Sequence, residues 1–216
     1  VENRPGAGGT VGLQEFMRLP ADGYNLMQFG VSQTLTPALY PRVKVDLRKD
    51  LAPIILTDSF DNVLVVGPES PIKTVQELVA ALRKKPGGLT FASAGNGTPA
   101  HLSGEVLKQE TKTFAVHLPY NVFPQAIGDT IAGRIDFMFL AAAAAVPQIR
   151  GGKLRPLGVT GANRLPWLKD VATMREQGFP DFVVSSWGSI VTHAGVSKAI
   201  IDRLNGEFAK ALATQE

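Results

Sequence analysis

The segment from Leu89 to Leu102 carries the residue types best suited to binding chemistry. It predicts a strand, then a flexible polar loop from Ser93 to Thr98, then a helix that begins at Pro99. Glycines let such a loop approach a ligand closely, and the unpaired N–H groups at a helix start favour an anion. Ser93, Asn96 and Thr98 add side-chain donors. The segment therefore predicts an anion site, although a capped strand–helix turn without a ligand would use the same residues.

A nucleotide fits the same glycines less well. Gly95–Ala100 matches G-x-G-x-x-A, the dinucleotide fingerprint. That chemistry requires an acidic residue about 20 positions further on to hold the ribose, whereas His117–Tyr120 contains none. Pro99 also removes one of the N–H groups that would face a pyrophosphate. A Rossmann-like nucleotide-dependent enzyme therefore stays only as an alternative.

Catalytic and metal-binding patterns are missing from the sequence. The three histidines, His101, His117 and His193, do not pair at H-x-x-x-H spacing, and no acid–histidine cluster suggests a metal. Ser93 lies near His101, but G-x-S-x-G is absent and no acid is placed to orient the imidazole. The chain has no cysteine, which excludes disulfides and thiol nucleophiles. We therefore predict that the protein is not an enzyme and uses no metal and no cofactor.

The composition indicates a globular chain with a modest charge. Its 216 residues suffice for one large domain or two small ones, and 44% of them are hydrophobic. The 22 basic and 19 acidic residues give a net charge of +3, too small and too scattered to indicate nucleic acid. No apolar run reaches the roughly 18 residues that a membrane-spanning helix needs. We therefore expect neither a nucleic acid partner nor a membrane span.

Strands and helices alternate along the chain, which predicts a mostly parallel sheet with helices on both faces. The expected strands are 24–29, 54–57, 63–67, 89–92, 114–118, 135–139, 154–160 and 182–191. The expected helices are 10–19, one opened by a capping box at Thr74–Glu77, 99–110, 124–133, 141–150, a short one near 171–177, and 199–215. Polar residues predict a loop at 32–34. At 58–62 they predict either a bend between two strands or a crossing between domains that contributes polar groups to a cleft.

The whole chain resembles the Bug (TctC-like) family, the extracytoplasmic solute-binding receptors of tripartite tricarboxylate transport systems. Its motifs follow the order of the family: Val1–Thr10, Ala21–Tyr24, Pro37–Pro41, Asp50–Pro53, Asn62–Val66, Ser93–Leu102, Pro119–Tyr120, Gly151–Leu154 and Ser186–Trp187. Many motifs in one order are far more specific than a single glycine pattern.

The resemblance implies an α/β protein of two Rossmann-like domains with a ligand cleft between them, the periplasmic-binding-protein or Venus-flytrap arrangement. Domain 1 would be discontinuous and incomplete, residues 1–61 plus 188–216, and domain 2 would span 62–187. The chain would cross between them near 61–67 and 183–191. The family also has a strand–loop–helix before Val1 and a further helical region after Glu216, so we expect N- and C-terminal pieces beyond this sequence.

Carboxylates in this family are held by backbone N–H groups, hydroxyls and ordered waters. The resemblance implies these ligand-binding residues in domain 1: Ser32, Gln33, Thr34, Asp58 and Ser59. In domain 2 it implies Ser93, Ala94, Gly95, Asn96, Gly97, Thr98, His101, Tyr120, Leu140 and Ala141. The family usually places a lysine, a glycine and serines where this chain has Asn121–Gln125, and a polar or acidic residue where it has Leu140–Ala141. These departures predict a carboxylate ligand with an apolar or aromatic body.

The resemblance also implies a partner and a location. We expect a monomer that closes on its ligand and delivers it to the membrane subunits of a tripartite tricarboxylate transporter. The sequence has no initiator methionine, charged n-region or apolar h-region, so we expect a mature periplasmic chain whose signal peptide lies outside this sequence. A ligand sensor that feeds a signalling partner is the alternative to transport.

Overall fold

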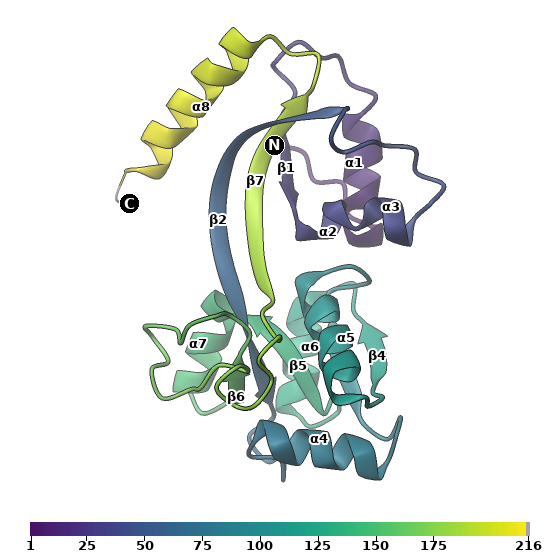
Figure 1. Cartoon of the computed structure of the whole chain (residues 1–216), viewed down its shortest axis with the longest axis vertical. Coiled ribbons are helices and arrows are strands. Elements are labelled where there is room, and N and C mark those ends of the chain that lie inside the picture. Colours follow the sequence, from purple (N-terminus) through teal and green to yellow (C-terminus); the bar gives the residue numbers. More distant parts are fainter. Residues whose placement is uncertain (215–216) are drawn as a thin grey trace. The chain divides into compact units, whose positions relative to one another are not determined.

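The computed structural model describes residues 1–214, and the chain divides into two compact units. Unit 1 contains Val1–Ser59 and the chain from Trp187 onward, and unit 2 contains Phe60–Ser186. The chain passes from one unit to the other within strand β2 (Leu51–Val66) and again within strand β7 (Ser185–His193) (Figure 1). In the part of the chain that the structure describes, no helix has the length and apolar character needed to cross a membrane.

Unit 2 is built on a mixed sheet. Its strands besides the end of β2 are β3 (Thr90–Ser93), β4 (Val116–Pro119), β5 (Phe137–Ala141) and β6 (Arg155–Val159). Strand β3 runs parallel to β4 and β5, whereas β2 runs antiparallel to both β5 and β6. Strands β3, β4, β5 and β6 therefore share one direction and β2 alone runs against them, so the sheet of this unit is mostly parallel, as predicted, except for β2. Hydrophobic periodicity identifies a buried strand but carries no information about its direction.

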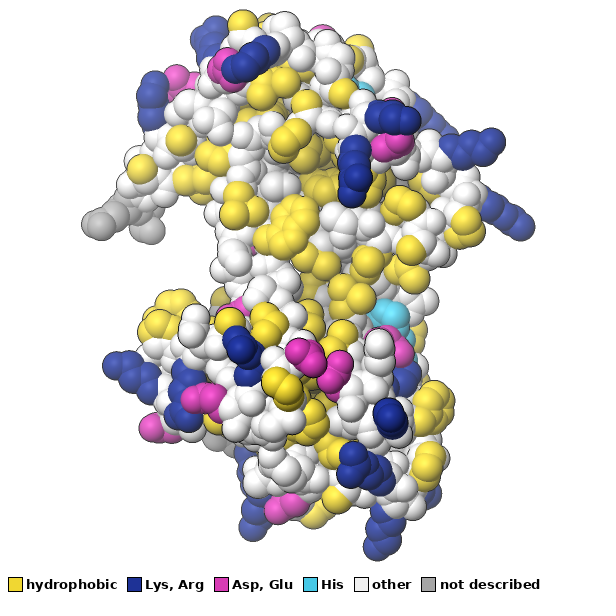
Figure 2. All heavy atoms as spheres, viewed as in Figure 1, with side chains coloured by type: hydrophobic (Ala, Val, Ile, Leu, Met, Phe, Trp, Pro, Cys, Tyr) yellow, Lys and Arg dark blue, Asp and Glu magenta, His cyan; other side chains and the backbone are white. Residues whose placement is uncertain are grey.

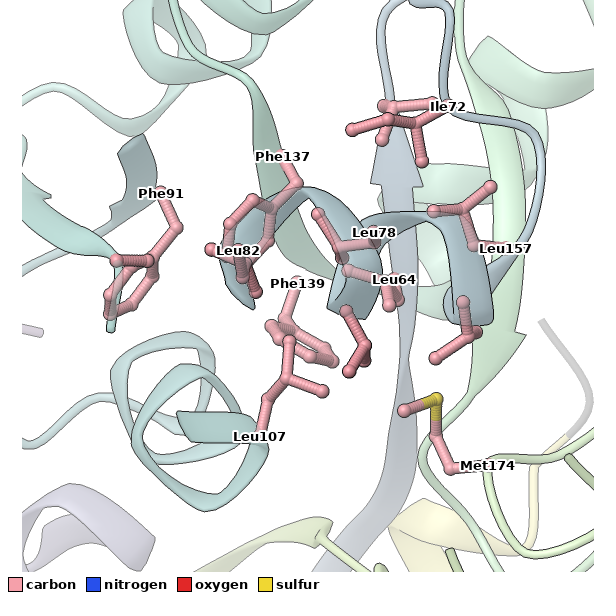
Figure 3. Close-up of a cluster of buried hydrophobic side chains, with 14 of the residues drawn as sticks. Leu64, Ile72, Leu78, Leu82, Phe91, Leu107, Phe137, Phe139, Leu157 and Met174 are labelled. Carbon is pink, nitrogen blue, oxygen red and sulfur yellow. The ribbon is translucent and has the colours of Figure 1, made fainter. Parts of the chain in front are cut away.

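Helices cover both faces of this sheet, as predicted. They are α4 (Val75–Lys84), α5 (Pro99–Thr111), α6 (Phe123–Ile131) and α7 (Ala142–Arg150). Successive side chains of a strand point to opposite faces. One set packs with α4 and α5, where Leu78 and Leu82 lie beside Leu64 and Phe137 (Figure 3). The opposite set, which includes Met138, packs with α6 and α7.

Helix α4 begins close to the predicted residue, but its cap differs in one detail. The N–H of Glu77 donates to Thr74 Oγ1 at 3.1 Å, which is the first half of the predicted capping box. The carboxylate of Glu77 accepts from the N–H of Lys73 at 2.6 Å and not from that of Thr74. The cap thus provides acceptors for one N–H in the first turn of the helix and for the N–H of the residue before Thr74.

Unit 1 is smaller and packs around a single cluster. It contains a 3₁₀ turn η1 (Ala7–Gly9), helix α1 (Thr10–Phe16), strand β1 (Met27–Gly30), helices α2 (Val31–Thr34) and α3 (Thr36–Leu39), and helix α8 (Lys198–Leu212). Strand β1 runs antiparallel to β7. The core consists of side chains from α1, β1, β2 and β7: Leu13, Phe16, Phe29, Leu51 and Val191. Residue 215, which the sequence placed in the last helix, lies outside the described residues.

The predicted bend at 58–62 is wrong, because β2 is one strand of 16 residues. Polar residues of this stretch bond to distant parts of the chain and do not turn it. Ser185 Oγ donates to Asp61 Oδ1 at 2.6 Å, and the N–H of Asn62 donates to Thr160 Oγ1 at 3.0 Å. These partners lie about a hundred or more positions away in the chain, so a local reading of the polar run mistook it for a turn.

Two further short elements differ from expectation. Residues 32–34 belong to helix α2 and not to a loop, because Gln33 Oε1 accepts from the N–H of Gly30 at 3.0 Å and closes a turn. The helix expected near 171–177 is absent from the described structure. There, Thr173 and Glu176 bond each other's backbone N–H groups in a single turn, while the N–H of Met174 donates to the carbonyl of Val159.

Candidate functional site

The loop between β3 and α5 is the strand–loop–helix that the sequence predicts. Strand β3 ends at Ser93 and helix α5 begins at Pro99, with Thr98 as the residue before its first turn. Gly95 and Gly97 have φ angles of 117° and 79°, a region of backbone conformation that favours glycine. The two glycines therefore shape this loop, and the rest of the site is built around them.

The hydroxyl groups of the loop are already engaged inside it. Ser93 Oγ accepts from the N–H of Gly95 at 3.0 Å and donates to the Gly95 carbonyl at 3.0 Å. Thr98 Oγ1 donates to the same carbonyl at 2.7 Å. Both side chains were predicted as donors to a ligand. In this structure they hold the loop in shape, which leaves the unpaired backbone N–H groups and the exposed side chain of Asn96 for recognition.

The backbone N–H groups at the start of α5 are the free donors of this region. Within residues 1–214, no hydrogen bond takes up the N–H of Asn96, Ala100 or His101. The first N–H groups of any helix lack partners inside the helix, and here no side chain caps them and no acidic residue lies in the first turn. Gly97 is different, because its N–H donates to His101 Nδ1 at 3.1 Å. Unpaired donors thus remain at Ala100 and His101 in the first turn of α5 and at Asn96 in the loop before it.

Two histidines lie under this loop. The ring centroids of His101 and His117 are 4.3 Å apart, and Phe91 stacks on His117 at 4.8 Å. His117 Nε2 lies 2.6 Å from Ser93 Oγ. Because the single proton of that hydroxyl goes to Gly95, His117 Nε2 is the donor. The sequence missed this contact, since only the parallel pairing of Phe91 with His117 brings the strands together.

The fold favours the neutral form of both histidines. Burial lowers the pKa of His101, against the opposing attraction of Glu105. Burial and the neighbouring His101 lower the pKa of His117 to about 4. Lys108 repels the charged form of both rings. A neutral His101 keeps a free lone pair on Nδ1, which is why it can accept from Gly97.

The other residues predicted in this unit fall into three environments. Tyr120 is beside the loop, because its N–H donates to the Ser93 carbonyl at 2.9 Å. Its hydroxyl donates to Asp129 Oδ2 at 2.7 Å, which raises the pKa of Tyr120 and lowers that of Asp129. Leu140 is fully buried in the core, so its side chain is away from solvent, whereas Ala141 is half-buried at the end of β5. Ala94 is exposed.

In unit 1 the predicted residues lie on α2 and β2. Thr34 Oγ1 donates to the Val31 carbonyl at 2.6 Å, and Asp58 Oδ2 accepts from Thr57 Oγ1 at 2.8 Å. Ser32 is half-buried on the same short helix as Gln33. The structure brings Thr34 and Ser59 together at the wall of one cavity within unit 1.

That cavity is large and mostly apolar. It has a volume of about 1250 Å³, and its lining includes Phe29, Leu47, Leu56 and Trp187. Hydrophobic side chains also gather on the visible surface of unit 1 (Figure 2). Trp187 packs against the core of unit 1 and also lines this cavity. The other apolar lining residues carry no signal that distinguishes them from core residues in the sequence. Among residues 1–214, no cluster of acidic or histidine side chains could hold a metal ion.

Comparison with known proteins gives one consistent match. Residues 1–215 match the family described as the tripartite tricarboxylate transporter family receptor, TctC. The chain is 34% identical over 217 positions to the "UPF0065 protein in tcbD-tcbE intergenic region" of Pseudomonas sp. (strain P51), covering 100% of this chain and 65% of that protein. It is 30% identical to Protein BugT of Bordetella pertussis, covering 67% of that protein. The chain thus spans about two thirds of the length of these relatives.

Solved structures agree with this match. MatC (Rpa3494) from Rhodopseudomonas palustris, with bound malate, has a TM-score of 0.89 and 26% identity, covering 97% of this chain and 72% of that one. Rpa4515 from R. palustris, with adipate, has a TM-score of 0.87 and 27% identity, covering 99% and 72%. The periplasmic binding protein BugD has a TM-score of 0.86 and 28% identity, covering 98% and 69%. The predicted α/β fold, of periplasmic binding-protein type, is confirmed.

Proposed function

Because the chain belongs to the tripartite tricarboxylate transporter family of receptors, we propose that it captures a small carboxylate for delivery to a membrane transporter. The family predicted from the sequence motifs is confirmed, and its members are receptors of transporters and not enzymes. Malate and adipate are the acids held by two similar proteins. Both are carboxylates on a short carbon chain, and we extend that ligand class to this protein.

The observation that carries the proposal is the set of unpaired donors at the start of α5 and in the loop before it. The N–H groups of Asn96, Ala100 and His101 have no acceptor within residues 1–214. A carboxylate offers several acceptor sites on two oxygens, and a helix start attracts negative charge. The internal bonds of Ser93 and Thr98 hold the loop in place before the ligand arrives, which reduces the entropy that binding costs.

The apolar character of the ligand rests on the segment after β4. Val122 is 50% exposed there, and Phe123 is half-buried against the core. Where the family usually has small polar residues, these side chains offer an apolar surface close to Tyr120. The contribution first expected from Leu140 is withdrawn, because that side chain is fully buried. We therefore propose a carboxylate whose body is aliphatic or aromatic and carries no ammonium group.

We further propose that capture involves both units, as two domains that close on the ligand. In this mechanism the residues of α2 and β2, Ser32 to Thr34 with Asp58 and Ser59, supply polar groups from unit 1. Closure stabilised by contacts to both units would be the signal that the transporter recognises. We propose a periplasmic monomer for this role. A decrease in the radius of gyration of the full-length protein on adding ligand, measured by small-angle scattering, would support closure.

Calorimetry and thermal unfolding test the proposed ligand class directly. A ligand at 100 times its dissociation constant stabilises the folded protein by about 2.7 kcal/mol, which raises the Tm by about 5–10 °C at this size. We expect this gain with malate, adipate or benzoate. Stabilisation by NAD alone would contradict the proposal, and tight binding of only aspartate, glutamate or citrate would contradict the apolar body.

A variant can remove one of the free donors. Ala100→Pro deletes a single N–H in the first helical turn, where proline is tolerated. Because a hydrogen bond to a charged group contributes about 1.5–3 kcal/mol, the carboxylate affinity should fall at least about tenfold. Ala100→Val is the matched control, since it adds similar bulk and retains the N–H. Equal affinities of the two variants would remove Ala100 from the site.

A further inference from the structure

The chain contains two Asn-Gly pairs, Asn96–Gly97 and Asn205–Gly206, and the structure places them in contrasting surroundings. In such a pair the backbone nitrogen of the glycine can attack the side-chain carbonyl carbon of the asparagine, because glycine has no side chain to obstruct the approach. Asn205 lies within helix α8, so the N–H of Gly206 belongs to the helical hydrogen-bond ladder. Asn205 Nδ2 also donates to the Ile54 carbonyl at 2.7 Å. These hydrogen bonds keep the nitrogen of Gly206 from attacking the side chain of Asn205.

The pair at Asn96 has none of these restraints. Asn96 is exposed, and no hydrogen bond within residues 1–214 involves its side-chain amide. The N–H of Gly97 lies outside the ladder of α5 and donates to His101 Nδ1 at 3.1 Å. That distance is within the reach of a general base. Burial lowers the pKa of His101, which favours the neutral ring, and the bond from Gly97 indicates the tautomer with its lone pair on Nδ1.

We propose that Asn96 is a site of spontaneous deamidation in the folded protein, with His101 Nδ1 accepting the amide proton of Gly97. The Gly97 nitrogen forms a bond to Asn96 Cγ while its N–H bond breaks toward His101. The bond from Cγ to Nδ2 then breaks, and Nδ2 leaves as ammonia with the proton returned by His101. A succinimide ring remains. Solvent water adds to one ring carbonyl and opens the ring to aspartate or isoaspartate, and no oxidant or reductant is needed.

The product places a new carboxylate in the loop, a consequence that rests on the proposed function. The free N–H groups of Ala100 and His101 would then have an internal anion as a competitor for the ligand. Two unit charges about 6 Å apart at an effective dielectric constant of about 20 repel strongly enough to weaken binding about a hundredfold. Each molecule that deamidates would therefore lose most of its affinity for the ligand while remaining folded.

Peptide mapping by mass spectrometry tests the chemistry without any ligand. The purified full-length protein is incubated at mildly alkaline pH, both folded and in urea. In urea we expect Asn96 and Asn205 to convert at similar rates, whereas in the folded protein only Asn96 should convert. His101→Gln should slow the reaction at Asn96 in the folded protein alone. An intact Asn96 in the folded protein, over a time in which both sites convert in urea, would overturn the proposal. Equal rates with and without His101 would overturn the role of the imidazole.

Binding of malate or adipate tests the consequence. Asn96→Asp should bind about a hundredfold more weakly than the parent protein, whereas Asn163→Asp makes the same charge change at an exposed position remote in sequence. Equal losses in both variants, or none in Asn96→Asp, would overturn the effect on the site. Prolonged incubation should lower the affinity of the parent protein and leave that of Asn96→Gln at its own starting value. If the fresh parent protein binds neither acid, the proposed function fails while the mass measurement still decides the chemistry.

Discussion

Substituting Gly104 by alanine should disturb the packing of helix α5 on Phe91, the ring that stacks on His117 beneath the candidate site. A Cβ at Gly104 would lie 2.7 Å from both Cδ2 and Cζ of Phe91 and closer still to Cε2. Carbon atoms in favourable contact are about 3.5–4.0 Å apart, so the ring or the helix would have to move by about 1 Å. Phe91 is fully buried, and its ring is stacked on His117 and, at 5.6 Å, on Phe137. The ring therefore has no free space to enter.

The expected cost follows from two opposing effects. Overpacking of this kind costs about 1–3 kcal/mol, and an overlap with three atoms of a fully buried ring belongs near the upper end. Replacing glycine by alanine inside a helix gains about 1 kcal/mol. Gly104→Ala should therefore reduce the free energy of unfolding by about 2 kcal/mol. Gly128→Ala is the matched control, because Gly128 lies in α6 and a Cβ there meets nothing within 4 Å.

Thermal and urea unfolding of the two variants measure this difference. Gly128→Ala keeps the gain in helix propensity and should be more stable than the parent by about 0.5–1 kcal/mol. The two variants should then differ by about 3 kcal/mol, or about 6–12 °C in Tm at this size. If Gly104→Ala proves as stable as Gly128→Ala, the Phe91 ring accommodates the added methyl group without cost, and the reasoning from close packing of α5 on β3 is refuted. A displaced ring would also tilt His101 and His117, so carboxylate binding should weaken only in Gly104→Ala.

Three further predictions concern the loop and its surroundings. The pKa of His117 is about 4 in the fold against an ordinary value of 6.5, so the unfolded chain takes up a proton first as the pH falls. The stability that the neutral His117 ring contributes should be present above about pH 6.5 and lost toward pH 4, so the Tm should fall over this range. His117→Gln should make that fall in Tm shallower. An equally steep fall in the variant would contradict the buried neutral ring. Arg155 donates to three carbonyls of the segment 68–72, and a lysine ammonium cannot reach all three. Arg155→Lys should therefore lower the free energy of unfolding by about 1.5–3 kcal/mol. An unchanged urea midpoint would refute this. Thr98→Ala removes the 2.7 Å bond to the Gly95 carbonyl and should weaken carboxylate binding about tenfold. Thr98→Ser keeps a hydroxyl for this bond and should retain the parent affinity. Equal affinities of the two variants would show that the hydroxyl does not order the loop.

Much of the fold is predictable from short-range preferences. Thr74 and Pro99 mark the starts of two helices because hydroxyl caps and first-turn prolines act within three or four residues. The same reasoning mistook 58–62 for a bend and 32–34 for a loop. At 58–62 the partners are distant, such as Ser185 for Asp61 across 124 positions of the chain. At 32–34 they are local, because Gln33 bonds to Gly30 and Thr34 to Val31 within one short helical turn.

The candidate site divides in the same way. Glycines, hydroxyls and a helix start are visible in the sequence, and so the loop at 93–98 was found. Its hydroxyls turned out to be engaged within the loop, and Leu140 turned out to belong to the core. The histidine pair under the loop was not expected, because it depends on which strand lies next to β3.

The sequence by itself determined the family, the alternation of strands and helices, and the glycine-rich loop before α5, because each depends on residue types at short separations. Only the tertiary structure decided that Ser93 meets His117, that His101 accepts from the N–H of Gly97, and that the N–H groups of Asn96, Ala100 and His101 stay unpaired. Strand direction and register bring Ser93 to His117, and both are settled by burial and pairing between segments far apart in the chain. The contact of His101 with Gly97 depends on the conformation of the loop between β3 and α5.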